Sequence, residues 1–214
     1  MKKIMFSDRY GLTQAVLEGR KTMTRRIIKG DYVAVIHLKY EGSFIGKTAD
    51  GESVILPQPT YKIGEEVAVA HCYKDIDYRG IVAYEDASDI QPGMVRPIFA
   101  RESAGWTNKM FVRADLMEET VRITNIKAER LQDISEEDAM REGVFKYDKP
   151  PLHHEYDMFA PWPPYVRPYK WDSNNLIYRC TARYAFAYLI DKISGGGTWN
   201  RNPWVYAYEF ELLK

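Results

Sequence analysis

Apolar residues along the first third of the chain form short strand-like runs around one helical stripe. The run KIMF at residues 3–6 predicts a short strand. Apolar side chains within residues 8–18 repeat at i, i+3 and i+4, which predicts a helix, and Gly19 stands where a glycine commonly ends one. The valine-rich runs DYVAVIHL (31–38) and EEVAVAHCY (65–73) are typical of strands.

The later pattern predicts two further helices and two further strands. Apolar residues alternate from residue 121 to 128, with a change of parity near Asn125 that indicates a bulge in one long strand. A capping serine and a terminal glycine frame a short helix at 135–142. Apolar residues at helical spacing predict a helix at 181–193, and alternation predicts a final strand at 204–212.

Many short strands with about three helices, and no regular βαβ alternation, indicate the α+β class. The prediction is a small β-barrel decorated with helices. The chain has 214 residues, of which 45% are hydrophobic and 28% charged, so a single domain spanning 1–214 can bury a core.

Basic residues gather at the start of a chain whose formal net charge is zero. Residues 1–30 contain eight Lys and Arg against two acids, and the stretch EGRKTMTRR at 18–26 is the densest part. A local basic patch on a neutral protein favours a specific anionic ligand. We therefore expect Arg20, Arg25 and Arg26 to form a rim that attracts a ligand of the nucleic-acid type.

Lys21 and Thr24 within this stretch have the residue types of a base and a nucleophile. A threonine hydroxyl attacks a carbonyl only after a base removes its proton, and a neutral lysine is such a base. Neighbouring arginines and burial both lower a lysine pKa. In a straight strand the two side chains face opposite sides, so the pair requires a bend at residues 22–23. The alternative is a basic edge strand whose cations deter sheet pairing.

The segment 145–179 holds six of the eleven prolines and nine of the 29 aromatic residues. Trp162 and Trp171 lie among its aromatic residues with basic residues between them, a pattern that suits stacking on bases; packing of the loop onto the barrel is the equal alternative. His153 and His154 in the same segment match no zinc spacing, so we expect neither a metal nor a cofactor.

Four segments together resemble the ASCH domain, a PUA-like β-barrel family, and most closely its phage and prophage branch. They are LEGRKTMTRRI, YKIGEEVAVAHCY, VRITNIKAERLQDISEEDAMREGV and GTWNRNPWVYAYEFELL, in this order along the chain. The resemblance covers about half of the chain. The stretches 74–104 and 145–179 have no counterpart in the small members of the family and are expected to be insertions.

The ASCH family includes small amidohydrolases that remove the acetyl group from N4-acetylcytidine. The resemblance implies Lys21 and Thr24 as catalytic residues, through the GRKTxTxR motif. It also implies a glutamate on a short helix, which is Glu142, or Asp138 if the alignment shifts by one helical turn. By sequence alone Glu142 has the residue type of a surface acid; at the end of a helix, its pKa would be raised by the helix dipole, which suits a proton donor.

The chain departs from the phage-type pattern after the GEEV strand. An RETW-like run is usual there, whereas residues 70–73 are Ala-His-Cys-Tyr. We expect His71 and Tyr73 to line the ligand pocket. The predicted function is binding of a nucleoside, nucleotide or RNA, with metal-independent hydrolysis of an N4-acylated cytidine. The alternative is a non-catalytic RNA- or DNA-binding module; a ribonuclease would need paired catalytic histidines, which we do not find.

The sequence also predicts a cytoplasmic protein that does not enter a membrane. No apolar run approaches the roughly 20 residues that cross a bilayer. The two cysteines, Cys72 and Cys180, are far apart and without a CxxC pairing, which is typical of free thiols in a reducing compartment. The oligomeric state has no signature in the sequence.

Overall fold

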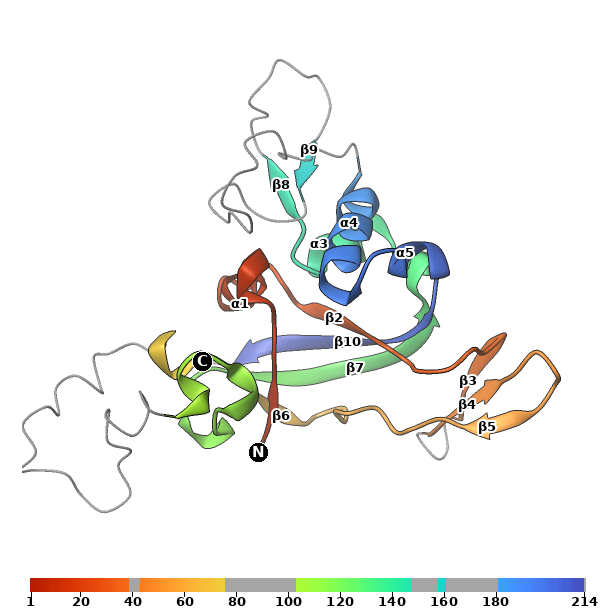
Figure 1. The fold of residues 1–214 in the computed structure, drawn as a ribbon, viewed down its shortest axis with the longest axis horizontal. Helices are drawn as coiled ribbons and strands as arrows, with labels where there is room; N and C mark the ends of the chain where they lie inside the picture. The colour runs from red at the N-terminus through yellow and green to blue at the C-terminus, as the bar shows by residue number, and fades with distance from the viewer. Residues whose placement is uncertain (39–42, 76–102, 148–157, 161–180, 214) are drawn as a thin grey trace, which may run out of the picture. The chain divides into compact units, whose positions relative to one another are not determined.

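The computed structural model describes residues 1–38, 43–75, 103–147, 158–160 and 181–213 (Figure 1). The chain divides into two compact units. Unit 1 consists of Met1–Phe6, Glu66–Val121 and Leu213–Lys214; unit 2 consists of Ser7–Glu65 and Arg122–Leu212. The sequence predicted one domain over 1–214. Most of the two predicted insertions lies outside the described residues.

Unit 1 is built on a parallel strand pair. Strand β1 (Lys2–Ile4) pairs with β6 (Glu66–Val69), with Lys2 opposite Val67 and Ile4 opposite Val69. The remaining described elements of this unit are short 3₁₀ turns: η2 (Tyr73–Asp75), η4 (Ala104–Trp106), η5 (Lys109–Phe111) and η6 (Ala114–Leu116). Its small core contains Ala68, Ala70, Tyr73, Val112 and Met117.

The central strands of unit 2 carry the candidate site. Strand β7 (Thr120–Arg130) starts at the end of unit 1 and neighbours β10 (Trp204–Leu213), which pairs antiparallel with β2 (Met23–Ile27). The whole hydrogen-bonded order is β1-β6-β7-β10-β2, so β2 is an edge strand. The expected single long strand over 121–128 is present as β7. Its buried alternation ends at Asn125, whose side-chain oxygen accepts from the N–H of Ile126.

A second sheet in unit 2 is an antiparallel meander of β3 (Ala34–Leu38), β4 (Ser43–Lys47) and β5 (Ser53–Ile55). Phe44 of β4 packs edge-on against Tyr206 of β10 at 4.9 Å between ring centroids. A third pair joins β8 (Phe145–Tyr147) to β9 (Met158–Ala160).

The prediction of a barrel is not met, although the α+β class is confirmed. Among the described residues the sheets remain open and do not close on themselves. The pattern of apolar residues predicts that a segment is a strand, but closure depends on which strands pair and with what stagger. That choice is made by contacts between segments far apart in the sequence.

The described α-helices lie in unit 2, and those predicted at 8–18, 135–142 and 181–193 are present there. The first is split: η1 (Asp8–Tyr10) and α1 (Leu12–Leu17) meet at Gly11, whose positive φ of 66° suits glycine. Then follow η7 (Leu131–Asp133), α3 (Glu136–Arg141), α4 (Ala182–Ser194) and α5 (Thr198–Arg201). Helices α3, α4 and α5 lie together beside β2 and β10 (Figure 1). No helix in the described ranges has the length and apolar character needed to cross a bilayer.

The core beneath these helices explains why α4 is amphipathic. Leu131, Ile134, Ala185, Phe186 and Ile190 are buried there with Val205 of β10. Ser135 begins α3, and its hydroxyl accepts a hydrogen bond from the N–H of Asp138 at 3.0 Å. This packing fixes α3, and with it the residue that follows the helix, against the sheet.

Two isoleucines on α4 allow a matched test of this core. Ile190 is 7% exposed, whereas Ile193 is 41% exposed. Replacement of Ile190 by Ala should lower the free energy of unfolding by about 2–5 kcal/mol, because it removes a buried side chain and leaves a cavity. Ile193→Ala should cost less than about 1 kcal/mol. Urea unfolding measures both, and equal losses would contradict the assigned core.

Candidate active site

Lys21 and Glu142 meet in the interior of unit 2, although 121 residues separate them. Lys21 Nζ lies 2.7 Å from Glu142 Oε2, and it also donates to the backbone oxygens of Glu142 and Met23, each at 2.7 Å. Lys21 is 2% exposed and Glu142 is 4% exposed. The Met23 oxygen belongs to the peptide group that joins Met23 to Thr24, so the ammonium lies beside the backbone of Thr24.

Turns at two glycines permit this contact between distant segments. Helix α1 ends before Gly19, which has a φ of +72°, and the Lys21 N–H then returns to the oxygen of Ala15 at 2.8 Å. Gly143 has a φ of +98°, and a Cβ there would lie 3.2 Å from Leu12 Cδ2 and 3.5 Å from Lys21 Cβ. A glycine after Glu142 therefore permits both the turn and the close approach to Lys21.

Arg25 is the second cation bound to Glu142. Its Nη1 donates to Glu142 Oε1 at 3.0 Å, its Nε and Nη2 both donate to Glu129 Oε1 at 2.8 and 2.6 Å, and Nη2 lies 3.1 Å from Asp138 Oδ2. The Arg25 side chain is fully buried. The sequence predicted that Arg25 belongs to a rim that attracts a ligand. The structure instead buries Arg25 and binds it to three carboxylates.

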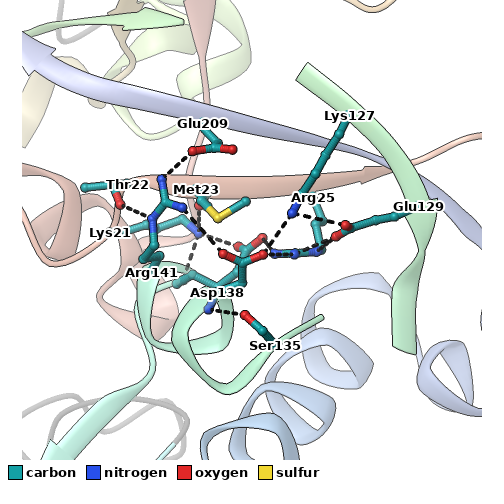
Figure 2. Close-up of polar contacts among 11 residues, drawn as sticks. Lys21, Thr22, Met23, Arg25, Lys127, Glu129, Ser135, Asp138, Arg141 and Glu209 are labelled. Atoms are coloured by element: carbon teal, nitrogen blue, oxygen red, sulfur yellow. Dashed lines mark hydrogen bonds and ion pairs between the residues drawn. The ribbon is translucent and has the colours of Figure 1, made fainter. Parts of the chain in front are cut away.

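Two more cations extend the network over β7, α3 and β10 (Figure 2). Lys127 Nζ lies 3.0 Å from Asp138 Oδ2 and 3.2 Å from Glu129 Oε2. Arg141 donates to the Thr22 hydroxyl at 3.1 Å and to Glu209 Oε2 at 2.8 Å. The network therefore contains four cations and four carboxylates. The cations are Lys21, Arg25, Lys127 and Arg141, and the carboxylates are those of Glu129, Asp138, Glu142 and Glu209.

The network shifts the pKa values of its members in directions set by burial and charge. Burial lowers the pKa of Lys21 below its ordinary value, against the opposing effect of Glu142, and the positive charges of Arg26 and Arg25 lower it further. Burial also acts to lower the pKa of Arg25, but Glu142 and Glu129 outweigh it and the pKa is raised. For Asp138, Lys127 and Arg25 outweigh burial, and the pKa is lowered.

Thr24 and Arg26 occupy the other face of β2. Side chains alternate along a strand, so Met23 and Arg25 share one face and Thr24 and Arg26 share the opposite one. Thr24 is 5% exposed and lies opposite Tyr208 on β10, whereas Arg26 is exposed. Among the described contacts, no hydrogen bond joins the Thr24 hydroxyl to Lys21 or Glu142. The structure thus brings Lys21 and Glu142 into contact, with Thr24 one peptide group away.

Arg26 nevertheless lies near enough to influence Lys21. Its charge contributes to the lowered pKa of Lys21 and also acts on Tyr61 and Tyr208. The rings of these two tyrosines pack edge-on at 5.4 Å. Of the three predicted rim arginines, Arg26 is thus the one that is exposed on the same face of β2 as Thr24.

The remaining predicted ligand residues lie elsewhere or outside the described residues. Arg20 forms an ion pair with Glu18, and its guanidinium lies 5.8 Å from the centre of the Phe145 ring. His71 and Tyr73 belong to unit 1, where His71 Nε2 lies 3.3 Å from Glu119 and the Tyr73 hydroxyl accepts from the N–H of Arg113. Trp162 and Trp171 lie outside the described residues, as do His153 and His154.

Sequence reasoning missed the acids that bind Arg25 and Lys127. Glu129 lies one residue beyond the strand predicted over 121–128, and Asp138 was named only as an alternative to Glu142. A signal was present: Lys127 and Glu129 are two residues apart on one strand, which places both side chains on one face. Only the fold shows that this face meets Arg25.

Comparison with models of known protein families, with curated proteins and with solved structures gives no match. The ASCH resemblance therefore rests on the sequence motifs alone.

Removal of the Glu142 charge tests the importance of the buried network for folding. Glu142→Gln leaves the charges of Lys21 and Arg25 buried without this carboxylate, which should lower the free energy of unfolding by about 3–5 kcal/mol. Glu137→Gln, on the exposed side of the same helix, is the control and should change little. Urea unfolding at neutral pH compares them; equal stability of Glu142→Gln and the unchanged protein would contradict the role of this pair.

Asp138 makes a prediction about acid stability. Because its folded pKa is lowered from 3.8, the carboxylate contributes stability that is present above pH 3.8 and is lost as pH falls through the folded pKa. Asp138→Asn should therefore flatten the decline of stability in this acid range. The exposed Asp133 supplies the control variant, Asp133→Asn. Urea midpoints measured from about pH 6 to about pH 2 test the prediction; equal slopes for the two variants would refute it.

Proposed function

We propose that the protein hydrolyses the amide of an N4-acylated cytidine, with Thr24 as nucleophile and the Lys21–Glu142 pair as its proton-transfer group. The observation that carries the proposal is the buried contact of 2.7 Å between Lys21 Nζ and Glu142 Oε2, beside the peptide group of Thr24. The substrate class comes from the ASCH resemblance. The same resemblance implies that this fold, with its open sheets, is related to the PUA-like family.

The resting pair is in its ionised form. Three acceptors surround Lys21 Nζ, and three N–H donors exist only in the ammonium. An ammonium is not a base. Catalysis therefore starts when one proton moves from Lys21 to Glu142 along their hydrogen bond, which leaves a neutral amine and a carboxylic acid. Burial supports this step because it disfavours the charged lysine, whereas Arg25 opposes it by stabilising the carboxylate.

The neutral pair has both groups that amide cleavage requires. The Thr24 hydroxyl makes no described hydrogen bond to Lys21 at rest, so this step requires the Thr24 side chain to come within hydrogen-bond reach of the Lys21 amine. The amine then accepts the proton of the hydroxyl while the oxygen of Thr24 bonds to the acyl carbon. Glu142 then gives its proton to N4 as the carbon–nitrogen bond breaks, which restores the ion pair. Water hydrolyses the acyl ester on Thr24, releases the carboxylic acid and returns the hydroxyl. The cycle consumes one amide and one water.

Arg26 is the residue that we assign to substrate binding. It is exposed on the face of β2 that carries Thr24, and the Tyr61–Tyr208 pair lies within range of its charge. A guanidinium there would bind an anionic or carbonyl oxygen of the substrate. Arg25 has a different role, because its donors are already bound to carboxylates; it holds Glu142 in position.

Thr24→Val is the sharpest test, because it removes the nucleophile without touching the network of ion pairs. Release of cytidine from N4-acetylcytidine, followed by mass, should fall by roughly 10³-fold or more. Thr22→Val is the matched control: it removes a hydroxyl two residues away that binds Arg141, and should keep turnover within about tenfold. Both variants should unfold at a similar urea concentration.

Two outcomes would overturn the proposal. If Thr24→Val keeps the turnover of the unchanged protein, Thr24 is not the nucleophile. If the unchanged protein releases no cytidine but binds RNA with an affinity that falls as salt rises, the non-catalytic binding module is the better description.

A further inference from the structure

A separate cavity of about 400 Å³ lies in unit 2 at the end of β2 that is remote from Lys21. It is lined by the segment that follows β2, by the last residue of β7, by α5 and by the start of β10. Its volume falls in the range of small-molecule sites, which is about 300–1,000 Å³. All of its lining residues lie in unit 2.

Three cations line this cavity, against one acid, Asp31. The Lys29 side chain has no partner among the described residues. Arg130 and Arg201 donate only to neutral oxygens: Arg130 to the backbone oxygens of Tyr32 and Asn202, and Arg201 to the oxygen of Gly196 and the hydroxyl of Thr198. Neither arginine forms an ion pair within the described part of the chain.

This pattern is the opposite of that in the buried network. There, each of four cations lies beside at least one carboxylate; here, three cations and a single acid, Asp31, line the cavity, and the described ion pairs include none between them. Three cations against one acid give the cavity an excess of positive charge, and the resulting positive potential favours an anion. Lys29 and Arg201 are exposed and Arg130 is partly exposed, so all three are accessible from solvent.

Arg130 is held in a fixed orientation toward its neighbours. Its guanidinium lies 4.9 Å from the centre of the Trp204 ring. The oxygen of Tyr32 accepts from both Arg130 Nη2 and Trp204 Nε1, at 2.8 and 2.9 Å. A planar cation fixed in this way loses little freedom when an anion binds, which favours phosphate recognition.

The cavity also has apolar walls. Ile27 is 42% exposed and Val33 is 57% exposed, and both line it with Trp204. Exposed apolar side chains beside unpaired cations suit a ligand with a flat apolar body and an anionic group. We propose that this cavity binds a nucleotide, with its phosphate at Lys29, Arg130 and Arg201 and its base against the apolar wall. The proposal does not depend on amide hydrolysis at Thr24.

Titration calorimetry with cytidine monophosphate tests the site. The Lys29→Gln variant should weaken binding by roughly tenfold, because one charge-assisted hydrogen bond is lost. With oligocytidylate as the probe, it should reduce the slope of log affinity against log salt by about 0.7. Lys62→Gln removes an exposed cation that does not line the cavity and should leave both quantities unchanged.

A second variant tests the volume of the cavity without changing charge. Ala49 lines the cavity and is exposed, so Ala49→Phe should fill it and abolish measurable binding of cytidine monophosphate. Ile55→Phe, at a residue that is 74% exposed and outside the cavity, is the control.

The source of the nucleotide follows from the same titrations. Tighter binding of oligocytidylate than of cytidine monophosphate, lost in Lys29→Gln, supports the site as a contact for RNA; equal binding supports it as a site for free nucleotide. Inorganic phosphate that binds as tightly as cytidine monophosphate would overturn the proposal, since the base would then have no place in the cavity. Absence of binding, or binding that neither variant changes, would overturn it as well.

Discussion

The burial of Lys21 and Arg25 against one carboxylate, that of Glu142, is the constraint on which the candidate site depends. Two cations in the interior would each lose several kcal/mol of hydration, and their mutual repulsion adds to this cost. Glu142 offsets both because each of its oxygens accepts from one cation, Oε2 from Lys21 and Oε1 from Arg25. A shift of α3 that moved this carboxylate would leave Lys21 and Arg25 buried without it, and Glu142 would no longer offset their lost hydration and mutual repulsion.

That constraint explains several features of unit 2 that are otherwise unrelated. Gly143 has no side chain because one there would crowd Leu12 and Lys21. Ser135 caps α3, and the core around Phe186 and Ile190 fixes the helix, so that its end delivers Glu142 to the edge strand β2. A buried ion pair adds little net stability over apolar packing, so specificity of this arrangement is the more direct benefit. In the proposed reaction the same confinement lowers the pKa of Lys21 and holds its proton acceptor in place.

Unit 2 therefore uses its basic residues in two ways. The cations of the buried network are bound to acids and position one another, and their charges are unavailable to a ligand. Lys29, Arg130 and Arg201 form no ion pair among the described residues and line a cavity with apolar walls. The two sets of cations lie near opposite ends of β2: the strand begins beside the Lys21–Glu142 contact and ends at Ile27, which lines the cavity. The formal net charge of zero for the chain does not show that some cations are paired with acids and others are not.

The sequence by itself determined the type of most described elements and the chemistry of the dense basic stretch. The i, i+3, i+4 pattern of α4 and the alternation of β10 reflect burial of one face, a local property that periodicity reports. The split of the first helix at Gly11 was not predicted, since one helix was expected over 8–18; it reflects a local preference of glycine for a positive φ. Lys21 and Glu142 were named from motifs, but nothing in their own segments places them at 2.7 Å.

Only the tertiary structure decided which strands pair, that the sheets stay open, and which cations are neutralised. Arg25 and Arg26 are adjacent in sequence and equal in charge, yet one is buried among three carboxylates and the other is exposed. Alternation along β2 sends them to opposite faces, and the carboxylates that bind Arg25, such as those of Glu129 and Asp138, come from segments more than a hundred residues away. The type of a residue determines its charge. Whether that charge is hydrated, paired with a carboxylate or available to a ligand depends on contacts that form only when the chain folds.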